Sequence, residues 1–114
     1  MIANAELQMR KGVLEFCILN IAARGAVYPS DIIQELKKSE MIVKEGTLYP
    51  LLTRLKNAQL LTYEWQESSS GPPRKYYRLT DTGEQFRTLL TEAWNRLQQT
   101  VQDSQLHQPQ NQPS

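Results

Sequence analysis

The sequence is short of the residues from which most catalytic and metal sites are built. Its 114 residues include one cysteine and one histidine, and that histidine, His107, lies in a polar tail with no cysteine near it. An internal disulfide is therefore excluded, and no Cys/His pair or metal-ligand cluster is evident. The five glycines form no phosphate-binding loop, and no pair of carboxylates has a catalytic setting. We expect neither an enzyme nor a bound metal or other cofactor.

Long hydrophobic runs are also lacking. The most apolar stretch, residues 13–23 (VLEFCILNIAA), is interrupted by Glu15 and Asn20 and is too short to cross a membrane. It has neither the basic start nor the small-residue cleavage site of a signal peptide. Because Cys17 is the single thiol, these features predict a reduced, cytoplasmic setting.

Neither sign of charge is in large excess, but the charges are unevenly distributed. Hydrophobic residues make up 39% and charged residues 22% of the chain, which is ordinary for one soluble globular domain. The formal net charge is +1, yet residues 1–80 hold 11 Lys/Arg against 8 Asp/Glu, whereas residues 81–114 hold 2 against 4. The basic surplus of the first part indicates an anionic partner.

Two helical patterns come first. Residues 4–24 predict a helix ended by Gly25, and its apolar side chains point in so many directions that other elements must cover most of its sides. A second helix is expected to begin near Pro29, with Ser30 as its N-cap, and to end at residues 37–40.

The third helix, residues 45–58, has two contrasting faces. One face has the helical spacing of buried leucines: Leu48, Leu51, Leu52 and Leu55. The opposite face presents hydroxyl, aromatic, cationic and amide groups: Thr47, Tyr49, Thr53, Arg54 and Asn57. Pro50 lacks a backbone donor, and that loss is cheapest in the first turn, so we expect the regular helix to start near Thr47.

After the third helix the period of the pattern changes to two. Leu61, Tyr63 and Trp65 alternate with polar residues and predict the half-buried face of a strand. Residues 68–73 (SSSGPP) predict a turn, and residues 74–80 (RKYYRLT) predict an antiparallel returning strand. Alternation divides that strand between two faces: Tyr77 and Leu79 on one, Tyr76 and Arg78 on the other.

A long last helix, residues 82–102, is expected to be capped by Thr80 or Asp81. Its apolar residues recur as in a coiled-coil seam: Phe86, Leu90, Ala93, Leu97 and Val101. Because the preceding elements can already close a small core, we expect this seam and Leu14 of the first helix to be buried against a second copy of the chain. Residues 103–114 are rich in Gln and Pro, have no period, and are expected to be disordered.

The order of these elements, three helices and then a hairpin with a Gly/Pro tip, is typical of a winged helix-turn-helix. The predicted fold is mainly α with a small β-hairpin. It comprises a DNA-binding domain at residues 1–81, a dimerisation helix at residues 82–102 and a disordered tail at residues 103–114. In this design the third helix lies in the DNA major groove, and the hairpin reaches phosphates or the minor groove.

The candidate DNA-binding residues lie on the third helix, near the starts of the second and third helices, and on the hairpin: Ser30, Lys44, Thr47, Tyr49, Thr53, Arg54, Lys56, Asn57, Ser70, Gly71, Arg74 and Lys75. Hydroxyls and amides can contact base edges, and Arg54 can bind guanine or a phosphate. Arg74 and Lys75 would give the wing salt-sensitive affinity. The alternatives are a solvated basic face for the cations, packing on the wing for Tyr49, and a flexible turn for the residues at the tip.

Two segments carry a resemblance to a known family: GTLYPLLTRL (46–55) with the following NAQLL (57–61), and SGPPRKYYRLTDTG (70–83). They resemble the signature of PadR-type transcriptional regulators over about residues 5–102, and the short C-terminal helix resembles the compact subgroup. The resemblance implies a dimeric winged-helix repressor whose first and last helices form the subunit interface. The chain departs from the pattern at Lys44 and Glu45, where the family often has a Ser-like cap.

Some members of that family bind planar aromatic effectors, so the resemblance implies that Trp94, with Phe16, can line a site for a flat ligand. The other interpretation of Trp94 is a buried anchor of the dimer, which is the commoner role of a Trp beside an apolar stripe. The alternative function is a winged helix that binds protein and not DNA, although its third helix would then be expected to present a neutral or apolar face. We predict a homodimeric repressor on a pseudo-palindromic, double-stranded operator.

Overall fold

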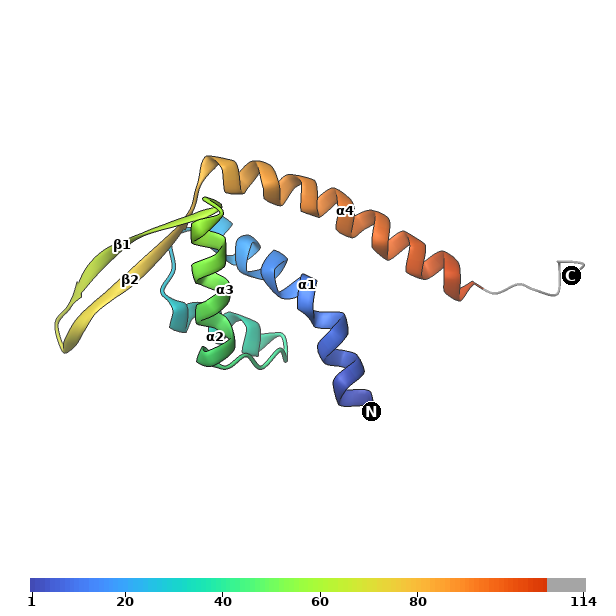
Figure 1. Ribbon diagram of the computed structural model, residues 1–114, viewed down its shortest axis with the longest axis horizontal. Helices are drawn as coiled ribbons and strands as arrows, with labels where there is room; N and C mark the ends of the chain where they lie inside the picture. The colour runs from blue at the N-terminus through green and yellow to red at the C-terminus, as the bar shows by residue number, and fades with distance from the viewer. Residues whose placement is uncertain (107–114) are drawn as a thin grey trace, which may run out of the picture.

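Four helices and a two-stranded hairpin make up residues 1–106, the part of the chain that this computed structural model describes. In chain order they are α1 (Ile2–Ala23), α2 (Pro29–Lys38), α3 (Glu45–Asn57), β1 (Leu61–Ser68), β2 (Gly71–Leu79) and α4 (Asp81–Gln105) (Figure 1). The first three helices and the hairpin form a winged helix, so the predicted fold class is confirmed.

The core lies where α1, α2 and α3 meet the base of the hairpin. Its fully buried side chains come from all of these elements: Ile18, Leu19, Ile32, Leu48, Leu52 and Leu61. Leu14, predicted to contact a second subunit, is only 8% exposed and belongs to the same core cluster as Val43 of the α2–α3 connection, so most of its side chain is already buried within one subunit. Cys17 packs half-buried against this core, and burial raises the pKa of its thiol.

The start of α2 differs from the prediction. The helix begins at Pro29 after the N-cap residue Tyr28, whose backbone N–H donates to Oδ2 of Asp31 at 3.0 Å. Ser30 is therefore not the N-cap, because a proline at the first helical position and the Asp31 carboxylate already complete the helix start. The Ser30 side chain is exposed in the first turn.

The end of α3 returns the chain to the core. Gln59 adopts a left-handed conformation with φ of 66°, and the following Leu60 N–H donates to the carbonyl oxygen of Leu55 at 3.0 Å. This arrangement satisfies the last carbonyls of the helix and buries Leu60. α2 ends in the same way, with Glu40 at φ of 64°.

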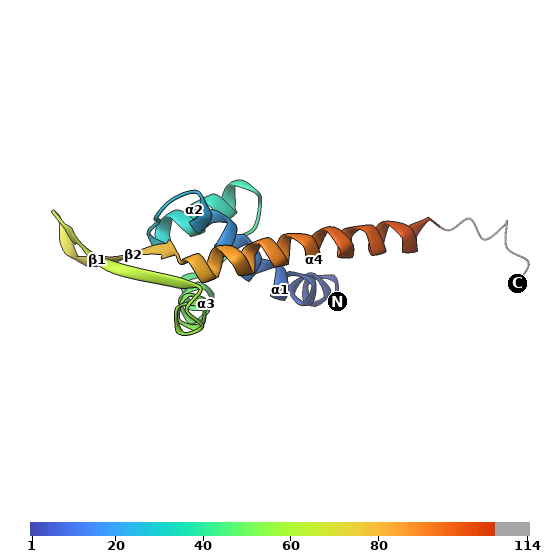
Figure 2. The ribbon, with the colours of Figure 1, turned by 90° about the horizontal axis from the view of Figure 1, so that it is seen from above.

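β1 and β2 pair antiparallel, with Tyr63 opposite Tyr77 and Trp65 opposite Lys75. At the base, Val27 and Tyr77 exchange backbone hydrogen bonds of 2.9 and 2.8 Å, which ties the hairpin to the α1–α2 connection. Of the two strand faces that alternation distinguishes, the one with Tyr77 faces the core, where Tyr77 is buried. The predicted burial of Trp65 was wrong, since it is 60% exposed. The hairpin extends beyond the helices (Figure 2).

One hydroxyl group joins the end of α3, the base of the hairpin and the start of α4. Thr80 Oγ1 donates to the carbonyl oxygen of Gln59 at 2.7 Å and accepts from the Gly83 N–H at 2.8 Å. The Thr80 N–H donates to the carbonyl oxygen of Leu60 at 3.1 Å. Thr80 is the N-cap of α4, and so is the correct one of the two predicted caps.

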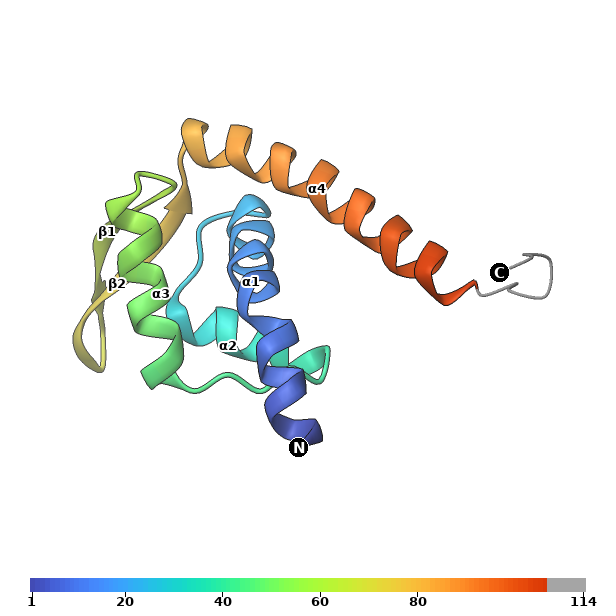
Figure 3. The same cartoon turned by 45° about the vertical axis from the view of Figure 1, so that its right-hand side comes forward.

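α4 begins beside α1, then diverges from it and projects away from the other elements (Figures 1 and 3). It continues to Gln105, so the predicted disorder of residues 103–105 was wrong. Residues 107–114 of the predicted tail lie outside the described residues. None of the helices within residues 1–106 combines the length and hydropathy that a membrane span requires.

Gly83 is the point of closest packing at the Thr80 junction, and its replacement by alanine tests that packing. A Cβ on Gly83 would overlap the carbonyl oxygen of Leu60 and lie 2.8 Å from Leu79 Cδ1. We expect Gly83→Ala to lower the free energy of unfolding by about 2 kcal/mol in urea denaturation, because the backbone must shift. The control is Gly12→Ala on α1, where the added Cβ meets open space and should stabilise the helix by up to about 1 kcal/mol. Equal stability of the two variants would contradict this packing.

Candidate nucleic-acid interface

The outward surface of α3 is a row of short side chains. Leu48, Leu52 and Leu55 turn into the core. Opposite them runs an exposed row at helical spacing: Gly46, Pro50, Thr53 and Asn57. Pro50 lies inside the helix and not in its first turn, contrary to the prediction, and has no N–H to donate to the Gly46 carbonyl. The row therefore allows close approach of a partner and leaves that carbonyl as an acceptor.

The flank of α3 that faces the hairpin forms a groove with it, which we name the α3–hairpin groove. Its lining comes from the start of α2, from α3 and from both strands: Pro29, Ser30, Tyr49, Thr53, Trp65, Pro73, Arg74, Lys75 and Tyr77. The groove brings together residues of the predicted DNA-binding set that are far apart in sequence, from Ser30 to Lys75. Tyr49 is 46% exposed there, so much of its ring remains free to contact a partner.

Aromatic rings hold the two cations of β2 in place. The Arg74 guanidinium lies 3.9 Å from the centre of the Tyr28 ring, on one face of the hairpin. The Lys75 ammonium, on the other face, lies 4.5 Å from the centre of the Tyr63 ring and 5.4 Å from that of Trp65. The predicted site did not include Tyr28, Tyr63 or Trp65. Strand alternation is the signal that could have found two of them, because it places Tyr63 and Trp65 on the same face of the hairpin as Lys75. Such contacts fix a cation without neutralising it.

The other flank of α3 faces α1. Arg54 forms an ion pair with Glu15 of α1, although 63% of the Arg54 side chain stays exposed. Lys44 and Thr47 line a separate groove against the N-terminal half of α1. Lys44 precedes α3 as its N-cap residue but makes no side-chain hydrogen bond there. The predicted DNA-facing residues of α3 are thus divided between two flanks of the helix.

The remaining predicted residues lie at the ends of α3 and of the hairpin. Lys56 and Asn57 are exposed in the last turn of α3, with Lys56 Nζ 5.9 Å from the centre of the Tyr63 ring. Ser70 and Gly71 are exposed at the hairpin tip, which extends away from the helices (Figure 2). A partner that contacts α3 and the tip together must be long.

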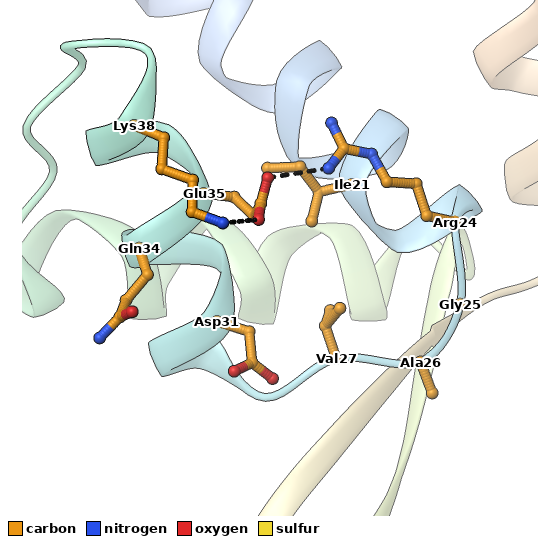
Figure 4. Close-up of a pocket in the computed structure, with 9 residues that line it drawn as sticks. All are labelled: Ile21, Arg24, Gly25, Ala26, Val27, Asp31, Gln34, Glu35 and Lys38. Carbon is orange, nitrogen blue, oxygen red and sulfur yellow. Dashed lines mark hydrogen bonds and ion pairs between the residues drawn. The ribbon is translucent and has the colours of Figure 1, made fainter.

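A separate hollow is lined by α1, α2 and the segment that connects them (Figure 4). Within it the Glu35 carboxylate accepts hydrogen bonds from Lys38 Nζ and Arg24 Nη1, both at 2.9 Å. These hydrogen bonds, that from Lys38 foremost, lower the pKa of Glu35. Because the three charged groups satisfy one another, we interpret this cluster as structural.

Trp94 lies in a groove between α1 and α4, which we name the α1–α4 groove. Its lining is mostly apolar: Met9, Arg10, Val13, Trp94, Leu97, Gln98, Val101 and Gln102. Phe16, the other predicted effector contact, is not part of the lining, to which α1 contributes Met9, Arg10 and Val13. Trp65 lines the α3–hairpin groove instead, so the two tryptophans belong to different sites.

A helix-turn-helix followed by a basic hairpin, with polar groups exposed on the third helix, defines a winged helix-turn-helix protein of the DNA-binding class. A family model described as "Transcriptional regulator PadR-like family" matches residues 18–89. The chain therefore belongs to the PadR-like family of transcriptional regulators.

Solved structures and a curated relative agree with this assignment. A PadR-like transcription factor from Bacteroides fragilis is 57% identical, with 88% of this chain and 97% of that chain covered and a TM-score of 0.76. A PadR-like transcriptional regulator from Bacillus cereus is 38% identical, with coverages of 87% and 97% and a TM-score of 0.77. The transcriptional regulator Rv3488 of Mycobacterium tuberculosis is 33% identical over 84% of this chain and 86% of its own length.

The Arg54–Glu15 pair generates a prediction about the α1-facing flank. Glu15→Gln should release Arg54 and remove a negative charge beside α3, so DNA affinity should rise and the slope of log affinity against log salt should steepen by about one. Glu35→Gln makes the same charge change at the Arg24–Lys38 cluster, which includes none of the candidate DNA-binding residues, and should leave affinity unchanged. Fluorescence anisotropy with a labelled duplex measures both, and equal effects of the two variants would exclude a DNA contact by Arg54.

Proposed function

We propose that the protein is a homodimeric repressor that binds a pseudo-palindromic DNA operator with α3 of each subunit. The α3–hairpin groove carries the proposal, because hydroxyl, phenol and cationic groups from α2, α3 and the hairpin face one opening. Among residues 1–106, Lys56, Arg74 and Lys75 form no ion pair with a carboxylate. Their charge is therefore available to neutralise phosphates.

In this proposal some residues contact base edges and others contact the DNA backbone. Thr53 and Asn57 of the outer row, with Tyr49 beside them, contact base edges in the major groove. Ser30, exposed at the N-terminus of α2, donates to a backbone phosphate, where the helix dipole also favours an anion. Residues 70–71 at the hairpin tip contact the adjacent phosphates or the minor groove.

The α1-facing flank supplies the outer contacts. Thr47 and Lys44 lie at the start of α3, where the backbone N–H groups and the Lys44 side chain both favour a phosphate. Arg54 contributes less than an unpaired cation would, because Glu15 already holds it.

The exposed apolar seam of α4 is the observation that supports the proposal of a dimer. Gly83 is the one buried residue of α4 within the described chain, whereas members of the predicted seam are exposed: Phe86 41%, Leu97 58% and Val101 52%. An apolar seam of this length on a projecting helix is most economically buried against a second copy. If the dimer helices set a spacing of about 34 Å between the two α3 helices, a two-fold axis would place those helices in successive major grooves.

Leu97→Glu tests the dimer. A carboxylate in the seam would be buried without a partner, so the variant should become monomeric and lose operator affinity by at least roughly tenfold. Asn95→Glu adds the same charge to an exposed position off the seam and should stay dimeric. Sedimentation equilibrium measures the mass of each, and a dimeric Leu97→Glu protein that binds DNA normally would place the interface elsewhere.

We further propose that a flat aromatic effector binds in the α1–α4 groove. Trp94 is 36% exposed in a mostly apolar lining, which suits stacking on a planar ligand. By biasing the angle between the two DNA-binding halves, such a ligand would release the operator.

In a Trp65→Phe background, where Trp94 is the single tryptophan, flat aromatic compounds that weaken operator binding should also quench Trp94 fluorescence. The measurement is made without DNA, so that binding of the compound to DNA cannot contribute. Release of the operator by a compound that leaves the emission of Trp94 unchanged would exclude this groove as the effector site.

The test of the function itself is a gel shift with the DNA just upstream of the protein's own gene, across a salt series. A tight, sequence-selective shift that weakens steeply with salt is expected, and Lys75→Glu should abolish it. Binding no tighter than to random DNA at every salt concentration, with no effect of Lys75→Glu, would favour the alternative of a protein-binding winged helix.

A further inference from the structure

Trp65 is exposed but held in place. It is 60% exposed, on the wall of the α3–hairpin groove. The Lys75 ammonium lies 5.4 Å from the centre of its ring system, and the Tyr63 ring meets it edge-on at 6.0 Å and 87°. A large apolar side chain that is fixed and still in contact with water indicates a partner surface.

The position of the groove limits what can lie against Trp65. When α3 lies in the major groove and the hairpin reaches toward the minor groove, the backbone of one DNA strand must pass between them. That backbone alternates anionic phosphates with apolar faces of deoxyribose. The groove has matching walls: Ser30, Arg74 and Lys75 suit phosphate, and Trp65 with Pro73 suits the sugar.

We propose that the Trp65 indole packs against deoxyribose of the DNA strand seated in the α3–hairpin groove. This inference rests on the proposed DNA-binding function and adds to it a contact that carries no charge. The wing then contributes a part of the affinity that salt does not screen, beside the phosphate contacts of Arg74 and Lys75. Because every nucleotide has the same sugar, this contact strengthens binding to operator and to random duplex alike.

The experiment compares Trp65→Ala, Trp65→Phe and Lys75→Gln in the full chain, by anisotropy with a labelled random-sequence duplex across a salt series. Trp65→Ala should weaken binding roughly tenfold at every salt concentration and leave the salt slope unchanged, because the lost contact is apolar. Trp65→Phe should restore most of the affinity. Lys75→Gln should instead lower the slope by about one. Urea denaturation should find Trp65→Ala nearly as stable as the parent, since the side chain is largely exposed.

A fluorescence titration reports the contact itself. In a Trp94→Phe background Trp65 is the single tryptophan, and its emission should shift to shorter wavelength when duplex binds, as water leaves the indole. Unchanged emission, together with unchanged affinity of the Trp65→Ala variant for the duplex, would overturn the inference. The proposed function would still stand in that case, because the parent protein binds the duplex. A parent protein that binds no duplex even at low salt would overturn both.

Discussion

The Thr80 hydroxyl is the interaction on which the arrangement of the molecule depends. It links the end of α3, through the carbonyl of Gln59, to the first turn of α4, through the N–H of Gly83. The absence of a side chain at Gly83 allows α4 to start directly against the backbone of Leu60. The helix proposed to contact DNA and the helix proposed to hold two subunits together are therefore joined at one closely packed junction.

The surface electrostatics depend on where charges are held and not on their sum. The formal net charge is only +1, yet aromatic rings from the α1–α2 connection and from β1 fix the two cations of β2 without cancelling them. The carboxylate of Glu15, in contrast, holds Arg54 on the far flank of α3. Arg74 and Lys75 thus keep their full charge toward the α3–hairpin groove, whereas the charge of Arg54 is offset by that of Glu15.

Periodic features of the sequence predicted most of the fold. The leucine spacing of α3 and the alternation that separates Tyr77 from Tyr76 both follow from local geometry and agree with the structure, although alternation alone did not say which of the two tyrosines is buried. Some of the errors are local, such as the N-cap of α2, and others concern tertiary context. Trp65 continues an alternating pattern but is 60% exposed, because it lines the open α3–hairpin groove and is not part of the core. The Arg54–Glu15 pair joins residues far apart in the chain, so no local pattern could show that the candidate site is divided into two flanks.

The central claim is that the α3–hairpin groove receives the backbone of one DNA strand while the outer row of α3 enters the major groove. A crystal structure of the protein with a duplex selected for tight binding tests this claim most directly. The account predicts Thr53 and Asn57 beside base edges, a sugar-phosphate strand between α3 and the hairpin, and the two α3 helices of a dimer about 34 Å apart. A complex in which DNA lies on another face, with the groove empty, would contradict it.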